Sequence, residues 1–168
     1  MAIALVAGQS GGGHQTGGNT VAKAFASNVT VGNFIVVCVT VYGQVSSVGD
    51  NLGNTYTPVI SNVYGGGSTY VYIYYAQVTT GGACTVTVNL DASTTAGIGT
   101  AEFSGIVTST PVETTTITDV DGPTTTPTSS NIVATSSTNL VVGVLGYYEN
   151  GDTVTKGGAY TNIYNDGA

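Results

Sequence analysis

The residues that most resemble a catalytic motif lie near the start of the chain. Gly8-Gln-Ser-Gly-Gly12 matches the pattern G-x-S-x-G, and His14, the only histidine, follows closely. In hydrolases this pattern holds a nucleophilic serine on a sharp turn between a strand and a helix. Here more glycine follows and no helix begins, and His14 lies too near Ser10 in sequence to match the usual order of a triad. We therefore interpret the segment as a flexible glycine loop after a first strand.

Carboxylates that could perform acid–base chemistry are few. A glycosidase needs two facing carboxyl groups at a defined separation, and the glutamates in the middle of the chain are Glu102 and Glu113. Glu102 alternates with apolar neighbours, so we expect it outward or in a cleft, hydrogen-bonded to local backbone. An enzyme would need a cleft that holds at least two of Glu102, Glu113, Asp119 and Asp121. We predict a protein without catalytic activity.

Two oxygen-rich loops could bind calcium, which prefers carboxylate, amide and carbonyl oxygens. They are Asp50-Asn-Leu-Gly-Asn54 and Asp119-Val-Asp-Gly122. Neither has EF-hand spacing, and Asp and Asn are also ordinary turn residues. The sequence leaves calcium open, with Asp50, Asn54, Asp119 and Asp121 as candidate ligands, and it predicts no other cofactor.

Cys38 and Cys84 are the only cysteines. Their spacing is compatible with the disulfide that joins the two sheets of an immunoglobulin domain, although the tryptophan of that pattern is missing. Free cysteine is also among the most buried residue types. Both alternatives, one disulfide or two buried thiols, stay open at this point. A zinc site is a weak alternative, because structural zinc needs four ligands.

Tyrosine is the most suggestive residue type, with 11 tyrosines and no tryptophan. The segment Thr69–Tyr75 alternates, so Tyr70, Tyr72 and Tyr74 share one face of a strand, and Tyr64 lies nearby in sequence. A solvent-facing ladder of this kind would serve as a subunit interface or a sugar-stacking platform. The alternative is cross-strand pairing that only stabilises the sheet.

Composition narrows the class of protein further. Only 7% of the residues are charged, against about 25% in an average soluble domain. The net charge is −7 with Lys23 and Lys156 as the only basic residues, which cannot supply the basic surface that nucleic acids or anionic membranes require. No apolar run is long enough to span a bilayer. A neutral surface rich in Thr, Ser, Asn and Tyr is common in extracellular and virion proteins.

The pattern of apolar residues predicts a single all-β domain over residues 1–168, because Val, Thr and Tyr abound and helix formers are scarce. Residues 33–42 are apolar on both faces, which predicts a central strand. Residues 84–90 alternate, with Cys84 and the apolar residues inward. Strands are predicted near residues 2–7, 20–26, 33–42, 55–61, 69–78, 84–90, 98–106, 114–119, 131–135, 139–147 and 159–164. About ten short antiparallel strands with glycine-rich turns indicate a β-sandwich of Ig-like or jelly-roll type.

One succession of motifs carries a resemblance. It comprises Gly53-Asn-Thr-Tyr-Thr57, Tyr72-Ile-Tyr-Tyr-Ala76, Val78-Thr-Thr-Gly-Gly82, Ala101-Glu-Phe-Ser-Gly-Ile106 and Asn139-Leu-Val-Val-Gly143. In these motifs the chain resembles a loose group of β-sandwich domains of bacterial surface proteins and phage structural proteins. The resemblance implies a structural or adhesive module and provides no catalytic residues. Such domains usually close with one more strand, so an incomplete sandwich would leave a groove that a neighbouring subunit could fill.

These observations favour a structural subunit of an extracellular or virion assembly, such as a phage decoration or fibre protein or a surface filament subunit. Its partners would be further copies of itself or neighbouring structural subunits, with no nucleic acid and no membrane. The alternative is a carbohydrate-binding or adhesive module that holds glycans on an exposed tyrosine face. The two differ in whether subunits cover the face of Tyr70, Tyr72 and Tyr74.

Overall fold

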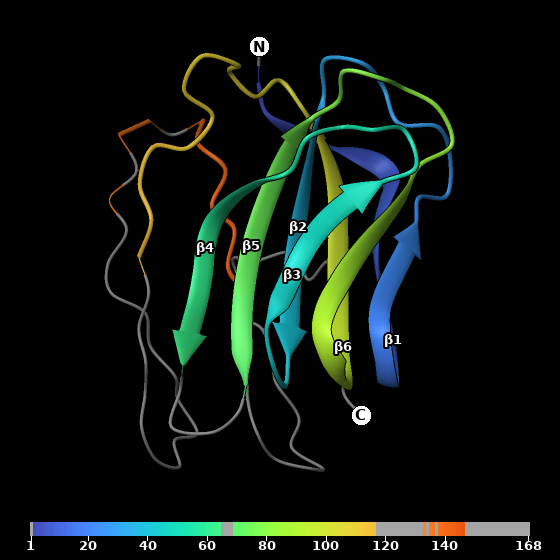
Figure 1. Ribbon diagram of the computed structural model, residues 1–168. Helices are drawn as coiled ribbons and strands as arrows, with labels where there is room; N and C mark the ends of the chain where they lie inside the picture. The colour runs from blue at the N-terminus through green and yellow to red at the C-terminus, as the bar shows by residue number, and fades with distance from the viewer. Residues whose placement is uncertain (1, 65–68, 117–132, 134, 137, 147–168) are drawn as a thin grey trace.

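The computed structural model describes residues 2–64, 69–116, 133, 135, 136 and 138–146. In this part of the chain the protein is all-β, and its six strands form one antiparallel sheet (Figure 1). The strands are β1 (Ala4–Ala24), β2 (Phe34–Val41), β3 (Val45–Asp50), β4 (Thr57–Tyr64), β5 (Tyr70–Gln77) and β6 (Thr85–Ser104). Within the same residues, no helix is long and apolar enough to cross a membrane.

The strand order is β1-β6-β2-β5-β4, and β3 pairs with β6 beside this path. The strand β2 is apolar on both faces and lies between β6 and β5, which confirms the predicted central strand. Residues 84–90 also follow the prediction: Cys84, Val86, Val88 and Leu90 are buried, and the residues between them are partly exposed.

Two long strands bend the sheet over on itself. The first part of β6 pairs with β3 and with the end of β1, whereas its second part pairs with β2 and with the start of β1. In Figure 1 the strand β3 lies in front of β2, and the Val45 amide on β3 donates a hydrogen bond to the Tyr72 hydroxyl on β5 at 3.4 Å. The two parts of the sheet therefore face each other across one core.

That main core gathers buried side chains from four strands, β1, β2, β5 and β6, and from two loops, and Val45 and Val48 of β3 pack against it. Its buried members are Val21, Val29, Ile35, Val37, Val39, Val41, Tyr72, Val78, Cys84, Val86, Val88, Leu90, Ala96 and Ile98. Most are β-branched, as expected for side chains that pack on a pleated surface.

A second, smaller cluster lies on the opposite face of β2, β5 and β6. Val36, Ile73, Ala101 and Phe103 are buried there. Part of their cover comes from the segment 139–146, whose Leu140, Val142 and Val144 pack against them. Both faces of the central strands are therefore shielded from water.

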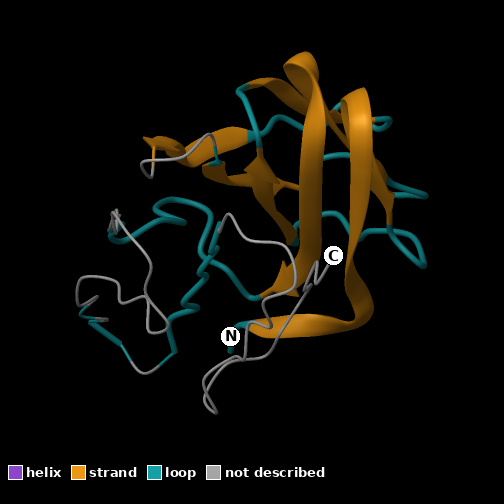
Figure 2. Ribbon diagram, turned by 90° about the horizontal axis from the view of Figure 1, so that it is seen from below, coloured by secondary structure: helices purple, strands orange, loops and turns teal. Residues whose placement is uncertain are grey.

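The glycine-rich segment after the first predicted strand is the main correction. It is not a flexible loop, because β1 runs without interruption through 21 residues and pairs with β6 from Ser10 to Gln15. β1 bends on either side of this stretch, where its register with β6 shifts. Gly8 and Gly17 lie in these bends and adopt φ of 73° and 70°. Figure 2 shows the strand turning sharply near the N-terminus.

Other strand predictions differ in detail. The predicted strands 84–90 and 98–106 are one continuous strand, and β3 was not predicted. Residues 114–116, 133, 135 and 139–146 lie in predicted strands but are not strands. Residues 117–119, 131, 132, 134, 147 and 159–164 lie outside the described chain.

A glycine at the end of β6 gives a test of this fold. Gly105 has φ of 80°, and a Cβ there would overlap the backbone carbonyl of Ala2. We predict that Gly105→Ala lowers the free energy of unfolding by about 1–3 kcal/mol, because it adds backbone strain and a clash. Urea denaturation measures the loss.

Gly49→Ala is the matched control, because a Cβ at Gly49 would meet nothing within 4 Å. We expect it to change stability by less than about 1 kcal/mol. Equal stabilities of the two variants would contradict the close approach of Gly105 and Ala2.

Candidate functional site

A fully buried carboxylate lies at one end of the main core. Glu102 on β6 has an exposed fraction of 0%, and it pairs with Ile35 of β2. Its Oε1 accepts hydrogen bonds from the Thr30 amide at 2.8 Å and from Asn33 Nδ2 at 2.7 Å. Its Oε2 accepts one from Gln9 Nε2 at 3.1 Å. All three donors are neutral groups, and they compensate the desolvation that would otherwise make this burial costly.

Gln9 extends this network to the loop between β1 and β2. Its side chain is 1% exposed, and its Nε2 also donates to the carbonyls of Ser27 at 2.9 Å and Asn28 at 3.2 Å. Its Oε1 accepts a hydrogen bond from the Ser27 amide at 3.1 Å. The Glu102–Gln9 network therefore fastens β1, β6 and residues 27–33 to one another.

The predicted position of Glu102 was wrong. The residue does lie on the face opposite to Ala101 and Phe103, but that face points into the main core, because the sheet folds over it. Its backbone partner, Thr30, lies 72 residues away in sequence. No periodic signal marked Gln9, Thr30 or Asn33, because their roles arise only once β1 and β6 pair.

A second polar network surrounds Asp50 at the end of β3. Its Oδ1 accepts hydrogen bonds from the amides of Leu52 at 2.9 Å and Asn54 at 3.1 Å, which is the pattern of an Asx turn. Its Oδ2 accepts from Asn54 Nδ2 at 2.9 Å and from the Tyr56 hydroxyl at 2.9 Å. The Cys84 thiol donates to the same oxygen at 3.6 Å.

Asn54 links this turn to the connection between β5 and β6. Its Oδ1 accepts the amides of Thr79 at 2.9 Å and Thr80 at 3.0 Å, and its Nδ2 donates to the Thr80 carbonyl at 3.2 Å. Asn54 is 5% exposed, so these bonds satisfy a buried amide.

The same contacts shift two pKa values. Partial burial alone would raise the pKa of Asp50, but the hydrogen bonds from Asn54, Tyr56 and Leu52 outweigh it and lower that pKa. Burial, the adjacent Asp50 charge and the hydrogen bond to it raise the pKa of Tyr56. Asp50 therefore acts as an ionised acceptor in a turn, and Tyr56 as a neutral donor.

The calcium prediction gains no support from this geometry. The Asp50 oxygens already accept five hydrogen bonds from the protein's own donors, and Asn54 faces backbone groups. Asp119 and Asp121 lie outside the described residues. Among the residues that the structure describes, no three His, Cys, Asp or Glu side chains gather in a way that could hold a metal ion.

Both cysteines are free thiols, and they lie on opposite faces of the sheet. Cys38 packs against the smaller cluster, whereas Cys84 belongs to the main core. This supports the second of the two alternatives from the sequence. Burial raises the pKa of Cys38 to about 12, and burial together with Asp50 raises that of Cys84 to about 12.

The tyrosine face does not form a solvent-facing ladder, which was one of the two alternatives left open by the sequence. Tyr72 is 4% exposed and lies in the main core, and Tyr70 and Tyr74 pack against it. The rings of Tyr72 and Tyr74 stack with centroids 6.2 Å apart. The alternation itself is confirmed, since Ile73 lies in the other cluster. The folded-over sheet turns this face inward, and of Tyr64 only the backbone is described, paired with Tyr70.

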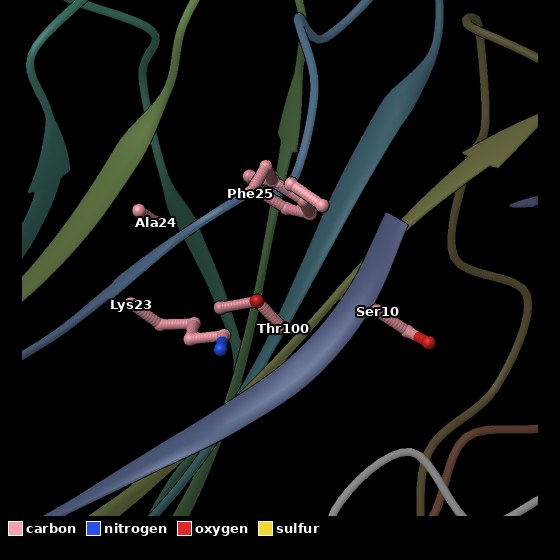
Figure 3. A pocket seen from close by; sticks show the side chains of 6 residues that line it. Ser10, Lys23, Ala24, Phe25 and Thr100 are labelled. Carbon is pink, nitrogen blue, oxygen red and sulfur yellow. The ribbon is translucent and has the colours of Figure 1, made fainter. Parts of the chain in front are cut away.

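The serine motif has no catalytic arrangement. Ser10 and His14 lie four residues apart on one continuous strand, which separates their Cα atoms by about 13 Å. Ser10 lines a small hollow of about 120 Å³ together with Lys23, Phe25 and Thr100. Figure 3 shows its hydroxyl pointing away from the Lys23 amine.

An enzyme would need a cleft that holds at least two of the four candidate carboxylates. The structure describes two of them, Glu102 and Glu113, and they do not meet in a cleft. Glu102 is sealed in the core, whereas Glu113 lies on the exposed segment after β6. There Glu113 accepts hydrogen bonds from the Thr135 amide at 3.3 Å and from the Asn139 side chain.

Comparisons with known proteins leave the family open. No protein family, no curated protein and no solved structure matches the chain.

Replacing the buried carboxylate tests the first network. Glu102→Gln puts an NH₂ group where Oε1 or Oε2 accepts hydrogen bonds, so one donor loses its partner. We predict a loss of about 1–3 kcal/mol in the free energy of unfolding. Thermal or urea denaturation at neutral pH measures it.

Glu113→Gln is the control, because it makes the same chemical change at an exposed site. Its effect should stay within about 0.5 kcal/mol. A Glu102→Gln variant as stable as the parent would show that the carboxylate is not held by these donors.

Thiol titration tests the state of the cysteines. Because their pKa values lie near 12, almost no thiolate exists at pH 8. We predict that a thiol-specific reagent modifies the folded protein slowly and modifies two thiols at once in denaturant without reductant. Two thiols that appear only after reduction would reveal a disulfide instead.

Proposed function

We propose that the protein is a non-catalytic structural subunit of an extracellular or virion assembly, and that subunits associate through the edges of their β-sheets. Phage decoration or fibre proteins and surface filament subunits are the kinds of assembly that fit. We also propose that the fold is a β-sandwich of Ig-like or jelly-roll type. The core enclosed between the two facing parts of the sheet supports this fold.

The long edge strand β1 is the observation that carries the proposal. Among the described residues, β1 pairs with β6 alone, although it extends through 21 residues. The outer edge of a strand presents unpaired amides and carbonyls, which are a template for another chain. Monomeric proteins usually protect such edges with proline, with several charges, with short strands or with β-bulges. β1 has three register irregularities, but its stretch from Ser10 to Gln15 has none. β1 contains no proline, and Lys23 is its one formally charged residue.

The low charge of the whole chain supports the same function. With 7% charged residues, the surface relies on hydroxyl, amide and backbone groups. Such groups lose less free energy than ions when a neighbouring subunit covers them. The tyrosine face packs inward, so the observation that would have favoured glycan binding is no longer there, and we propose no second function.

Mass measurement in solution tests the proposal. Light scattering over a wide range of concentration should show a defined oligomer or a growing assembly, and electron microscopy of the same sample should show rings, filaments or discrete particles. A protein that stays monomeric up to millimolar concentration would contradict association through its own sheet edges.

A further inference from the structure

Of the three sheet edges in the described chain, β1 offers the longest open backbone. β3 has six residues and ends in the Asp50 turn. β4 has eight, contains Pro58, and departs from regular register with β5 twice. A proline removes a backbone donor, and register irregularities hinder the addition of a further strand. β1 also departs from regular register with β6, three times, but its regular stretch from Ser10 to Gln15 is longer than any in β3 or β4.

The distribution of charge indicates what can approach this edge. All nine acidic residues of the chain lie at position 50 or beyond, so β1 contains none, while the net charge is −7. Two copies of so acidic a protein repel each other wherever their carboxylates face. Because β1 itself contributes no carboxylate, two copies can pair along this strand without bringing carboxylates of the strand face to face.

From these observations we infer that two copies of this chain pair antiparallel, β1 against β1, along Ser10–Gln15. Antiparallel pairing of one strand with its own copy satisfies a two-fold axis, which is the commonest symmetry of homo-oligomers. Centred on this stretch, the pairing keeps Lys23 of one copy apart from Lys23 of the other. Centred on the other regular stretch, Thr20–Ala24, it would bring the two lysines together.

The pairing also suits the side chains of this stretch. Ser10 and His14 are exposed, and the residues between them are three glycines. No bulky side chain of the stretch therefore stands between two approaching backbones. The inference rests on the proposed function. It specifies that the partner is a second copy of this chain and that the edge used for association is β1.

Cross-linking from a cysteine on β1 tests the inference. Ser10→Cys is a nearly isosteric change at an exposed position. In a two-fold pair centred on Gly13, Ser10 of each copy lies about 20 Å along the strands from its counterpart and on the same face of the sheet. A bis-maleimide that spans this distance should give a covalent dimer. Cys84 is buried, Cys38 is partly buried, and burial raises both thiol pKa values to about 12, so they add little background.

Thr57→Cys on β4 is the matched control, because Thr57 is also exposed and lies on the rival edge. We expect the dimer yield of Ser10→Cys to exceed that of Thr57→Cys at least fivefold, and to fall to the same level when the protein is diluted to monomer. His14→Cys, which lies nearer to the proposed axis, is the second β1 variant and should cross-link with a shorter reagent.

The outcomes separate this inference from the proposed function. If light scattering shows oligomers but the β1 variants cross-link no better than Thr57→Cys, the β1 pairing is wrong and assembly stands. If the parent protein forms no oligomer at any concentration, the proposed function fails, and the inference with it.

Discussion

The buried carboxylate of Glu102 is the constraint on which the arrangement of the long strands depends. A carboxylate without exposure to water must find its donors inside the protein, or its burial costs several kcal/mol. Here the donors come from β1, through Gln9, and from the β1–β2 loop, through Thr30 and Asn33. The carboxylate is satisfied only when β1 lies beside β6 and the loop closes over the end of the core.

This constraint explains why a glycine-rich segment is a strand. The paired stretch of β1 has few side chains that could bury apolar surface, and glycine loses the most conformational freedom on folding. The polar contacts of Gln9 hold the strand at one end, and Val21, which is 3% exposed, holds it at the other. Between them β1 depends on its backbone ladder to β6. A strand fixed in this way keeps its outer edge available, which is the feature that our functional proposal uses.

Much of the core could be predicted from the sequence, and the reasons for the failures are physical. The alternation of residues 84–90 and the apolar character of residues 33–42 gave the correct faces, because burial repeats every second residue in a strand. The turn at Asp50 was also recognisable from its residue types. Alternation cannot tell, however, whether the second face of a strand meets water or a folded-over part of the same sheet. For that reason Glu102 and Tyr72 were placed on the correct face but in the wrong environment. The network of Gln9 could not be predicted, because its partners lie up to 93 residues apart.

Hydrogen exchange at the Thr30 and Ser27 amides tests most directly whether the Glu102–Gln9 network holds the fold. Both residues lie on an exposed loop, where amides ordinarily exchange fast, but their N–H groups point to Glu102 and Gln9. The network predicts that both amides are protected nearly as strongly as those of β2, because they exchange only when the core opens. Exchange within about tenfold of the rate of an unstructured peptide would contradict it, and would mean that the loop opens without disturbing the core.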